Sequence, residues 1–228
     1  MSTIRYIADW HWDHTNILRY DNRPWKTVRE MDSELIRLWN ETVAKDDIVY
    51  SLGDMVWSGK IDVWKDVLSQ LNGQIFIVKG NHDETWILNE LKDSGLITGW
   101  SHQEVVLDPK LNGKSRYVVL NHSPMPFFVN MHHNNTYHLY GHVHISFDAQ
   151  VIKHVRKQIE DLYLHDVRMY NCGCMIPGMG YVPRTLDEII EIDKTNRKNE
   201  SETLEDYLKA KIELGHDKAR LGEITRSI

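Results

Sequence analysis

Aspartate, asparagine and histidine residues recur in this chain at one kind of place, just beyond short apolar segments that are typical of buried strands. Five such segments are followed by them, and the residues are Asp9, His11, Asp54, Asn81, His82, His122, His142 and His144. In open α/β sheets, ligands bind outside the carboxyl ends of the strands. The pattern therefore predicts a sheet-based fold whose functional site lies where the strand ends meet.

The first half of the chain alternates strand-like and helical segments. We expect strands over 4–9, 47–52 and 74–79, and helices over about 27–44, 61–71 and 84–93. Thr27 and Glu30 form a capping box, and Met31, Leu35 and Leu38 then recur at helical spacing. Strands that alternate with helices predict a parallel sheet with covering helices.

The second half has a different pattern. Segments 104–107 and 117–120 flank a turn-rich stretch and predict a hairpin. We then expect a strand over 137–140, a helical stretch over about 149–164 and a last strand over 168–174. Beyond residue 191 the chain is charged and poor in aromatic residues, which predicts a mostly solvated helix.

Composition excludes several classes of protein. The 228 residues carry a net charge of −6, which disfavours stable nucleic-acid binding because that needs a basic face. No stretch approaches the ~18 apolar residues of a membrane span, and the N-terminus lacks a signal-peptide pattern. We therefore expect a cytoplasmic protein without a membrane partner. Cys172 and Cys174 are too few for a disulfide framework, and we expect both to be partly buried strand residues.

Seven of the recurring polar side chains are metal ligands by residue type: Asp9, His11, Asp54, Asn81, His122, His142 and His144. One divalent ion takes roughly four to six ligands. Seven donors, with one carboxylate able to bridge, fit two ions about 3.5–4 Å apart. Nitrogen and oxygen donors without thiolate favour Mn, Fe, Zn or Ni over Mg or Ca, and we favour Mn.

The order of these blocks resembles a known family. Asp9-Trp10-His11, Gly53-Asp54, Gly80-Asn81-His82-Asp83, His122 and Gly141-His142-Val143-His144 resemble the five signature blocks of the calcineurin-like metallophosphoesterase superfamily. The segments 9–17 and 180–189 resemble a small stand-alone bacterial and phage branch. The resemblance implies a four-layer α/β/β/α sandwich over 1–190, with a helical insert at about 145–168. Residues 191–228 would form a charged helical C-terminal extension.

The resemblance also implies a role for each residue. One ion would be held by Asp9, His11, Asp54 and His144, and the other by Asp54, Asn81, His122 and His142. Asp54 would then bridge the two ions. His82 resembles the family's non-ligand histidine that protonates the leaving group, and Asp83 would orient the His82 ring. A hydroxide between the ions would attack phosphorus, because metal binding lowers the pKa of water from 15.7 towards ~7.

Two positions depart from the family pattern. Ala8 stands where a small hydroxyl residue is common, and Asp13 stands where we expect glycine. His14 and Arg184 are further candidates for contact with the substrate. The alternatives are a structural histidine and a salt-bridged arginine.

Other large side chains have simpler interpretations. Helical spacing predicts three tryptophans in the core, Trp39, Trp64 and Trp86. Trp10 and Trp12 flank the first ligands and line either the core or the site. Three histidines are expected in a polar loop or at a strand edge, with the cleft as the alternative: His132, His133 and His138.

We therefore expect a metal-dependent hydrolase of phosphate esters. A small phosphodiester or nucleotide is the favoured substrate, and a phosphomonoester is the alternative. A non-catalytic binding module on the same fold is the third possibility, but such a module would be expected to lose ligands, and none is missing here. A homo-oligomer is left open.

Overall fold

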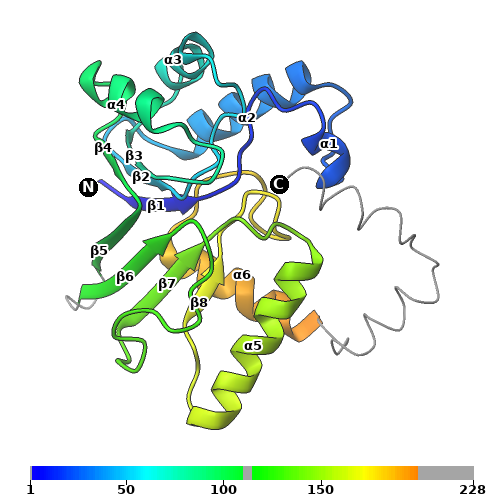
Figure 1. Ribbon diagram of the computed structural model, residues 1–228, viewed down its shortest axis with the longest axis vertical. Helices are drawn as coiled ribbons and strands as arrows, with labels where there is room; N and C mark the ends of the chain where they lie inside the picture. Colours follow the sequence, from blue (N-terminus) through cyan, green and yellow to red (C-terminus); the bar gives the residue numbers. More distant parts are fainter. Residues whose placement is uncertain (1, 110–114, 200–228) are drawn as a thin grey trace.

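Two four-stranded sheets lie between two groups of helices in the computed structural model, which describes residues 2–109 and 115–199 (Figure 1). The first sheet has the order β1-β2-β3-β4 and is parallel throughout. Its strands are β1 (Ile4–Ile7), β2 (Ile48–Ser51), β3 (Gln74–Val78) and β4 (Gly99–Ser101). The parallel sheet that the alternating pattern predicts is thus confirmed.

The second sheet has the order β5-β6-β7-β8. Its strands are β5 (Gln103–Pro109), β6 (Ser115–Asn121), β7 (Thr136–Tyr140) and β8 (Met169–Asn171). β5 and β6 form the predicted antiparallel hairpin, while β6, β7 and β8 are parallel. Apolar side chains of both sheets, among them Ile7, Ile77, Val118 and Leu139, belong to one buried cluster, so the sheets pack on each other through a shared core.

Helices cover the outer faces of this pair of sheets (Figure 1). They are α1 (Ile17–Tyr20), α2 (Val28–Thr42), α3 (Ile61–Ser69), α4 (Thr85–Asp93), α5 (Phe147–Tyr163) and α6 (Leu186–Asn199). In Figure 1, α2, α3 and α4 lie beside the first sheet, and α5 and α6 lie beside the second. The four-layer α/β/β/α arrangement is therefore confirmed. Among the described helices, none is both long and apolar enough to cross a bilayer.

The predicted capping box does begin α2. The Thr27 side chain accepts a hydrogen bond from the Glu30 N–H at 3.1 Å. The Glu30 carboxylate reaches one residue further back than expected, to the Lys26 N–H at 3.0 Å. The helix then buries Met31, Leu35 and Trp39.

Tryptophans mostly occupy the core. Trp10 and Trp12 are fully buried and stack in parallel with their ring centroids 4.5 Å apart. Both therefore belong to the core. Trp39 and Trp64 are buried as predicted. The prediction for Trp86 is wrong, because it is 53% exposed and α4 buries Ile87, Leu88 and Leu91 instead.

The ends of β1 and β8 join the two sheets. β8 ends at Asn171, three residues earlier than predicted. Beyond it the chain moves to the first sheet, where the Ala8 N–H donates to the Cys172 carbonyl at 3.0 Å and the Cys174 N–H donates to the Ala8 carbonyl at 2.9 Å. Both cysteines are fully buried free thiols at this junction.

The second group of helices includes α6, which runs across the predicted boundary between residues 190 and 191. Its side chains pair with the rest of the fold on both sides of that point. Asp187 contacts Arg116 of β6, and Asp193 lies 3.1 Å from Arg156 of α5. The division into a domain and an extension stays a prediction, and the helix expected in the tail after residue 199 lies outside the described residues.

Candidate metal centre

Left-handed backbone carries most of the predicted ligands. Asp9, His11, Asp54, His142 and His144 have φ angles of 60°, 55°, 52°, 70° and 46°. Such angles are uncommon for residues other than glycine, and they cluster at functional sites, where the surrounding structure holds them. Each of these turns follows a strand end, so the chain reverses at the sheet edge and directs a polar side chain into the same space.

Glycine allows two of these loops to approach each other. A Cβ on Gly80 would lie 2.2 Å from Asp54 Oδ1, and a Cβ on Gly141 would lie 2.6 Å from Asp9 Oδ2. Contacts this short exclude any side chain at the two positions. The glycines that precede the ligand residues are therefore needed to bring neighbouring loops into contact around the two carboxylates.

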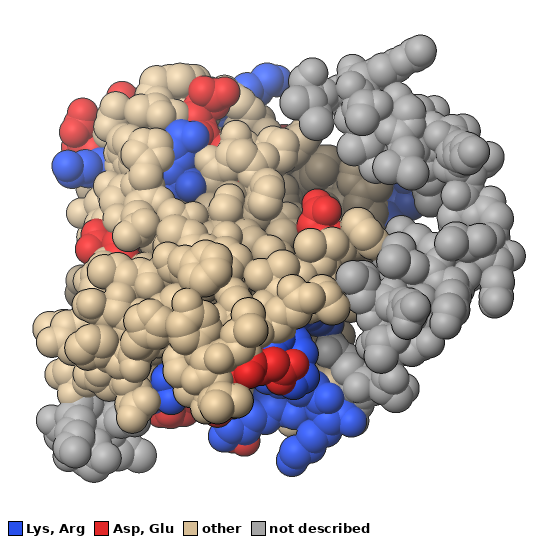
Figure 2. Space-filling model, turned by 60° about the horizontal axis from the view of Figure 1, so that its bottom comes forward, with Lys and Arg blue, Asp and Glu red and all other residues tan. Residues whose placement is uncertain are grey.

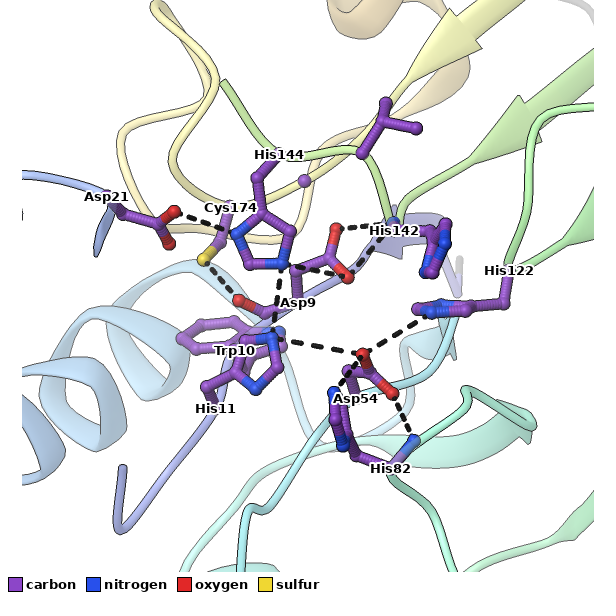
Figure 3. Close-up of polar contacts among 12 residues, drawn as sticks. Asp9, Trp10, His11, Asp21, Asp54, His82, His122, His142, His144 and Cys174 are labelled. Atoms are coloured by element: carbon purple, nitrogen blue, oxygen red, sulfur yellow. Dashed lines mark hydrogen bonds and ion pairs between the residues drawn. The ribbon is translucent and has the colours of Figure 1, made fainter. Parts of the chain in front are cut away.

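Asp54 lies between histidines from several loops (Figure 3). Its Oδ2 is 3.4 Å from His122 Nε2 and 3.9 Å from His11 Nε2, and its Oδ1 accepts a hydrogen bond from the His82 backbone N–H at 2.9 Å. Burial alone would raise the pKa of Asp54, but the neighbouring histidines, above all His122, lower it below its usual value. This carboxylate is therefore ionised and reaches both sides of the centre.

Asp9 is the second buried carboxylate, with no exposed surface. Its oxygens accept from the His142 backbone N–H at 3.0 and 3.1 Å, and Oδ1 lies 3.8 Å from His144 Nε2. Burial raises the pKa of Asp9. Two sets of donor atoms that each lie within 4.8 Å of one another share Asp9: one set adds His11 and His144, and the other adds Asp54 and His122.

The imidazole nitrogens of four histidines converge at the centre, where most of the neighbouring polar atoms are hydrogen-bond acceptors. His11 Nε2 and His144 Nε2 are 3.2 Å apart, while His122 Nε2 and His142 Nδ1 lie 2.8 and 2.9 Å from the same oxygen, Asn81 Oδ1. A neutral imidazole presents one lone pair, so these rings, once His122 has lost its proton, would offer several nitrogen donors beside the carboxylate oxygens in one small volume. Imidazole and carboxylate donors suit divalent transition metals, and this donor set fits them.

Two of the histidines are oriented through their other nitrogen. His122 Nδ1–H donates to the Leu52 carbonyl at 2.7 Å, and His144 Nδ1–H donates to Asp21 Oδ1 at 2.8 Å. Burial would lower the pKa of His122, but its contact with Asp54 outweighs burial and raises the pKa to about 9. Metal-binding histidines are commonly fixed in this way, which leaves Nε2 free for a ligand bond.

Asp21 and Arg23 have roles that the sequence analysis missed. The Arg23 guanidinium is fully buried and donates to Asp21 Oδ2 at 3.0 and 3.2 Å. It also donates to the backbone carbonyls of Trp10 and Asp9 at 2.6 and 2.8 Å. Arg23 therefore holds the first ligand loop while Asp21 holds His144. A loop residue without periodicity gives no sequence signal for such a contact.

His82 stands at the edge of the centre. Its side chain is 41% exposed, Nε2 lies 4.0 Å from Asp54 Oδ2, and its ring centroid is 4.5 Å from that of Trp57. His82 belongs to neither set of converging donors. That position is compatible with the predicted role at the leaving group, which stays a prediction.

The hydrogen bonds of Asp83 within the described residues go to backbone groups. Its buried carboxylate accepts from the backbone N–H groups of Gly80 and Asp54 at 2.8 and 3.0 Å. The role predicted for it, orienting the His82 ring, stays a prediction. Burial, followed by the charge of Asp54, raises the pKa of Asp83 to about 6. Asp83 is therefore a residue that holds two loops together.

The two weaker candidates behave differently. His14 is 7% exposed and stacks on Trp57 beside the centre, with ring centroids 3.9 Å apart. Burial lowers the pKa of His14 to about 4, so the ring is neutral. Arg184 donates to the Met179 carbonyl at 3.0 Å and pairs with Glu188 at 3.2 Å, and the structure does not bring it to the centre.

The remaining candidates have structural surroundings. His138 is buried in β7, where Nδ1 donates to the Val119 carbonyl at 2.9 Å. Asp13, where the family pattern has glycine, has a φ angle of 62°, which explains the preference for glycine there. The Asp13 N–H donates to the Asp32 carboxylate at 3.2 Å, and burial raises the pKa of Asp32 to about 6.

Comparison with known proteins decides the family. The sequence profile described as calcineurin-like phosphoesterase matches residues 2–218. This chain belongs to the calcineurin-like phosphoesterase family. The resemblance seen in the five blocks is thereby confirmed, and the fold agrees with it.

Two relatives share part of the sequence. An uncharacterized protein of Methanocaldococcus jannaschii is 45% identical over 85 residues, which are 37% of this chain and 48% of that protein. The Gene 66 protein of Mycobacterium phage D29 is 34% identical over 86 residues, 36% of this chain and 41% of that protein. The matches thus span less than half the length of each relative.

A solved structure resembles the fold. It is a protein of unknown function from Aquifex aeolicus, which is 18% identical and has a TM-score of 0.59. The similarity covers 84% of this chain and 100% of that protein. At this level of identity the comparison supports the architecture alone.

Proposed function

We propose that this protein is a dinuclear, metal-dependent phosphoesterase that hydrolyses a small phosphodiester. The observation that carries the proposal is the convergence of two carboxylates and four imidazoles on one volume at the edges of both sheets (Figure 3). Two divalent ions, with Mn favoured, would supply an activated water and neutralise charge on the phosphate. Two observations support two ions rather than one. The two sets of donors share Asp9, and Asp54 Oδ2 lies near both His11 and His122.

Residues of the chain would hold the reacting groups in place. One ion would be bound by Asp9, His11, Asp54 and His144, and the other by Asp54, Asn81, His122 and His142. His82 is partly exposed beside the centre, so it can give a proton to the oxygen of the departing alcohol. Its position is fixed by the bond from its backbone N–H to Asp54 Oδ1.

The charge around the centre supports a diester over a monoester. A cavity of about 290 Å³ adjoins His82, and no Lys or Arg occurs among the described residues that line it. A diester carries one negative charge, whereas a monoester carries close to two at neutral pH. The ions would neutralise part of the charge of either ester, and the second negative charge of a monoester would meet no cationic side chain in this cavity. The face drawn in Figure 2 is mostly uncharged, with basic side chains gathered beside acidic ones at its lower edge.

Metal content and turnover test this proposal together. Protein stripped of metal and reloaded with Mn should bind two equivalents and hydrolyse bis-p-nitrophenyl phosphate faster than p-nitrophenyl phosphate. A firm stoichiometry of one with all ligands intact would refute the dinuclear centre. Full loading without hydrolysis of either ester would favour the non-catalytic binding module, and faster hydrolysis of the monoester would favour a phosphatase.

A further inference from the structure

A cavity of about 290 Å³ opens beside the metal centre. His82 and His144 form part of its wall, so the cavity continues directly from the reacting groups. The wall also includes His14, Trp57 and Ile145, which are not among the proposed metal ligands. Its volume lies at the lower end of the range for small-molecule sites, about 300–1,000 Å³.

Part of the wall is an aromatic surface beside the proposed ligand His11, whose ring centroid lies 5.5 Å from that of His14 and 6.1 Å from that of Trp57. His14 and Trp57 stack with ring centroids 3.9 Å apart and planes within 5°, and Tyr20 meets His14 edge-on at 6.2 Å. His14 Nδ1 has no hydrogen-bond partner, so ring packing holds this histidine. Trp57 nevertheless remains 42% exposed and Tyr20 62% exposed. An aromatic ring such as Trp57, which packs on His14 with one face and is partly exposed, is suited to stacking with a planar ligand.

This surface lies where a leaving group would be. The Trp57 ring centroid is 4.5 Å from that of His82, the proposed proton donor. An alcohol oxygen within hydrogen-bonding distance of His82 therefore places the rest of its molecule against Trp57. The ester group on the other side of the phosphorus would point away from this wall.

The charge of the cavity limits what the leaving group can be. Besides the histidines, its only ionisable side chains among the described residues are Tyr20 and Asp21. Asp21 is already paired with Arg23 and His144. Nothing there would balance a second phosphate, so the wall suits a neutral group.

We propose that this cavity selects phosphodiesters whose leaving alcohol is a nucleoside, and that Trp57 recognises the base by stacking. The inference rests on the proposed phosphodiesterase function. In the reaction, a water gives up one proton to the solvent and its oxygen bonds to phosphorus, while the bond from phosphorus to the nucleoside oxygen breaks. That oxygen takes the proton of His82, and the solvent returns a proton to His82. The cavity volume of about 290 Å³ is that of a site for a small ligand such as one nucleoside.

Two matched substrates isolate the base. Methyl adenosine-5′-phosphate and methyl ribose-5′-phosphate have the same leaving oxygen and differ in the base alone. Base–aromatic stacking predicts that kcat/KM for the adenosine ester is about 5- to 150-fold higher. Trp57→Ala should bring this ratio close to one. Trp86→Ala is the matched control, because Trp86 is also partly exposed, at 53% against 42% for Trp57, but lies on α4 outside the cavity. This variant should keep the ratio.

A binding measurement separates this inference from the proposed function. Equilibrium dialysis of the Mn-loaded protein with adenosine should give a dissociation constant that Trp57→Ala raises about 5- to 150-fold, and that Trp86→Ala leaves within twofold. Adenosine binding that depends on Trp57, without hydrolysis of any ester, would sink the proposed function and leave the cavity assignment standing. Hydrolysis with equal rates for both esters, or without dependence on Trp57, would overturn the assignment alone. If Trp57→Ala does not fold, Trp57→Leu replaces it, because leucine keeps an apolar side chain but has no ring. An unchanged ratio of kcat/KM for the two esters in Trp57→Leu would likewise overturn the cavity assignment.

Discussion

Asp21 offers a sharp test of how the centre is held, because it contacts a ligand without being one. Its side chain is 3% exposed, Oδ1 lies 2.8 Å from His144 Nδ1, and Oδ2 lies 3.0 Å from the Arg23 guanidinium. Both partners are donors. In Asp21→Asn only one side-chain oxygen remains, so the new amide group must face either the imidazole or the guanidinium. The variant therefore loses either the bond to His144 or both bonds from Arg23, depending on which way the amide turns.

The expected loss of metal affinity follows from that contact. Removing the partner of a metal-binding histidine typically costs 10- to 100-fold in affinity, which is about 1.4–2.7 kcal/mol. If the amide faces His144, the imidazole is driven towards the tautomer with its proton on Nε2, which cannot bind a metal. Arg23 loses its counter-charge as well. Breaking a buried ion pair costs about 3–5 kcal/mol of stability, and this is an upper bound because Arg23 still donates to two backbone carbonyls.

Two measurements keep these effects apart. Titration of metal-stripped protein with Mn gives the affinity, and thermal unfolding without metal gives the stability. Asp66→Asn, on the exposed side of α3, is the control and should change neither. An affinity for Mn within twofold of the wild type would refute the argument, and a drop in stability alone would reduce Asp21 to a structural partner of Arg23.

Three further predictions concern His82 and the proposed ligands. His82→Ala should keep its metal and lose about 10²–10⁴-fold in turnover, with a smaller loss for a p-nitrophenyl ester, and metal analysis with two substrates checks both points. Asp54→Asn should lower metal content and turnover more than Asp9→Asn, because Asp54 Oδ2 reaches His122 and His82 as well as His11; a larger deficit in Asp9→Asn would assign the bridge to Asp9. Mn binding at pH 7.5 should release at least about one proton, because the His122 pKa of about 9 keeps that ring protonated without metal. Calorimetry in two buffers of different ionisation enthalpy measures the release, and none at all would contradict the raised pKa.

Local patterns account for the part of the fold that the sequence predicts. Apolar runs that end in glycine and polar residues mark β1, β2, β3 and β7 without reference to the rest of the chain. β4 carries no such signal, because Gly99–Ser101 is three residues long and becomes a strand only by pairing with β3. Trp86 was misplaced for a related reason. Helical spacing indicates that one face is buried, but the burial of Ile87, Leu88 and Leu91 decides which.

The candidate site divides in the same way. The ligands follow strand ends and could be predicted, whereas the residues that position them depend on contacts between distant segments. Asp21 and His144 are 123 positions apart, and nothing near Asp21 in the sequence indicates the pairing. Trp57 is likewise known as part of a wall only once His14 lies against it. Asp83 makes the same point, because its hydrogen bonds to the Asp54 and Gly80 backbone could not be predicted from its place next to His82.

Two buried ionic side chains, Arg23 and Asp83, hold the loops on the two sides of the centre. Each makes hydrogen bonds to peptide groups just beyond a strand end. Peptide groups beyond a strand lose their partners in the sheet, yet buried peptide groups must be hydrogen-bonded. At the first loop the groups without a partner in the sheet are carbonyls. The Arg23 guanidinium donates to the carbonyls of Asp9 and Trp10. At the facing loops the groups without such a partner are N–H groups, and the Asp83 carboxylate accepts from Asp54 and Gly80. Because these bonds are made within the protein, the ligand loops have their arrangement before any metal binds, and the binding free energy need not be spent on ordering them.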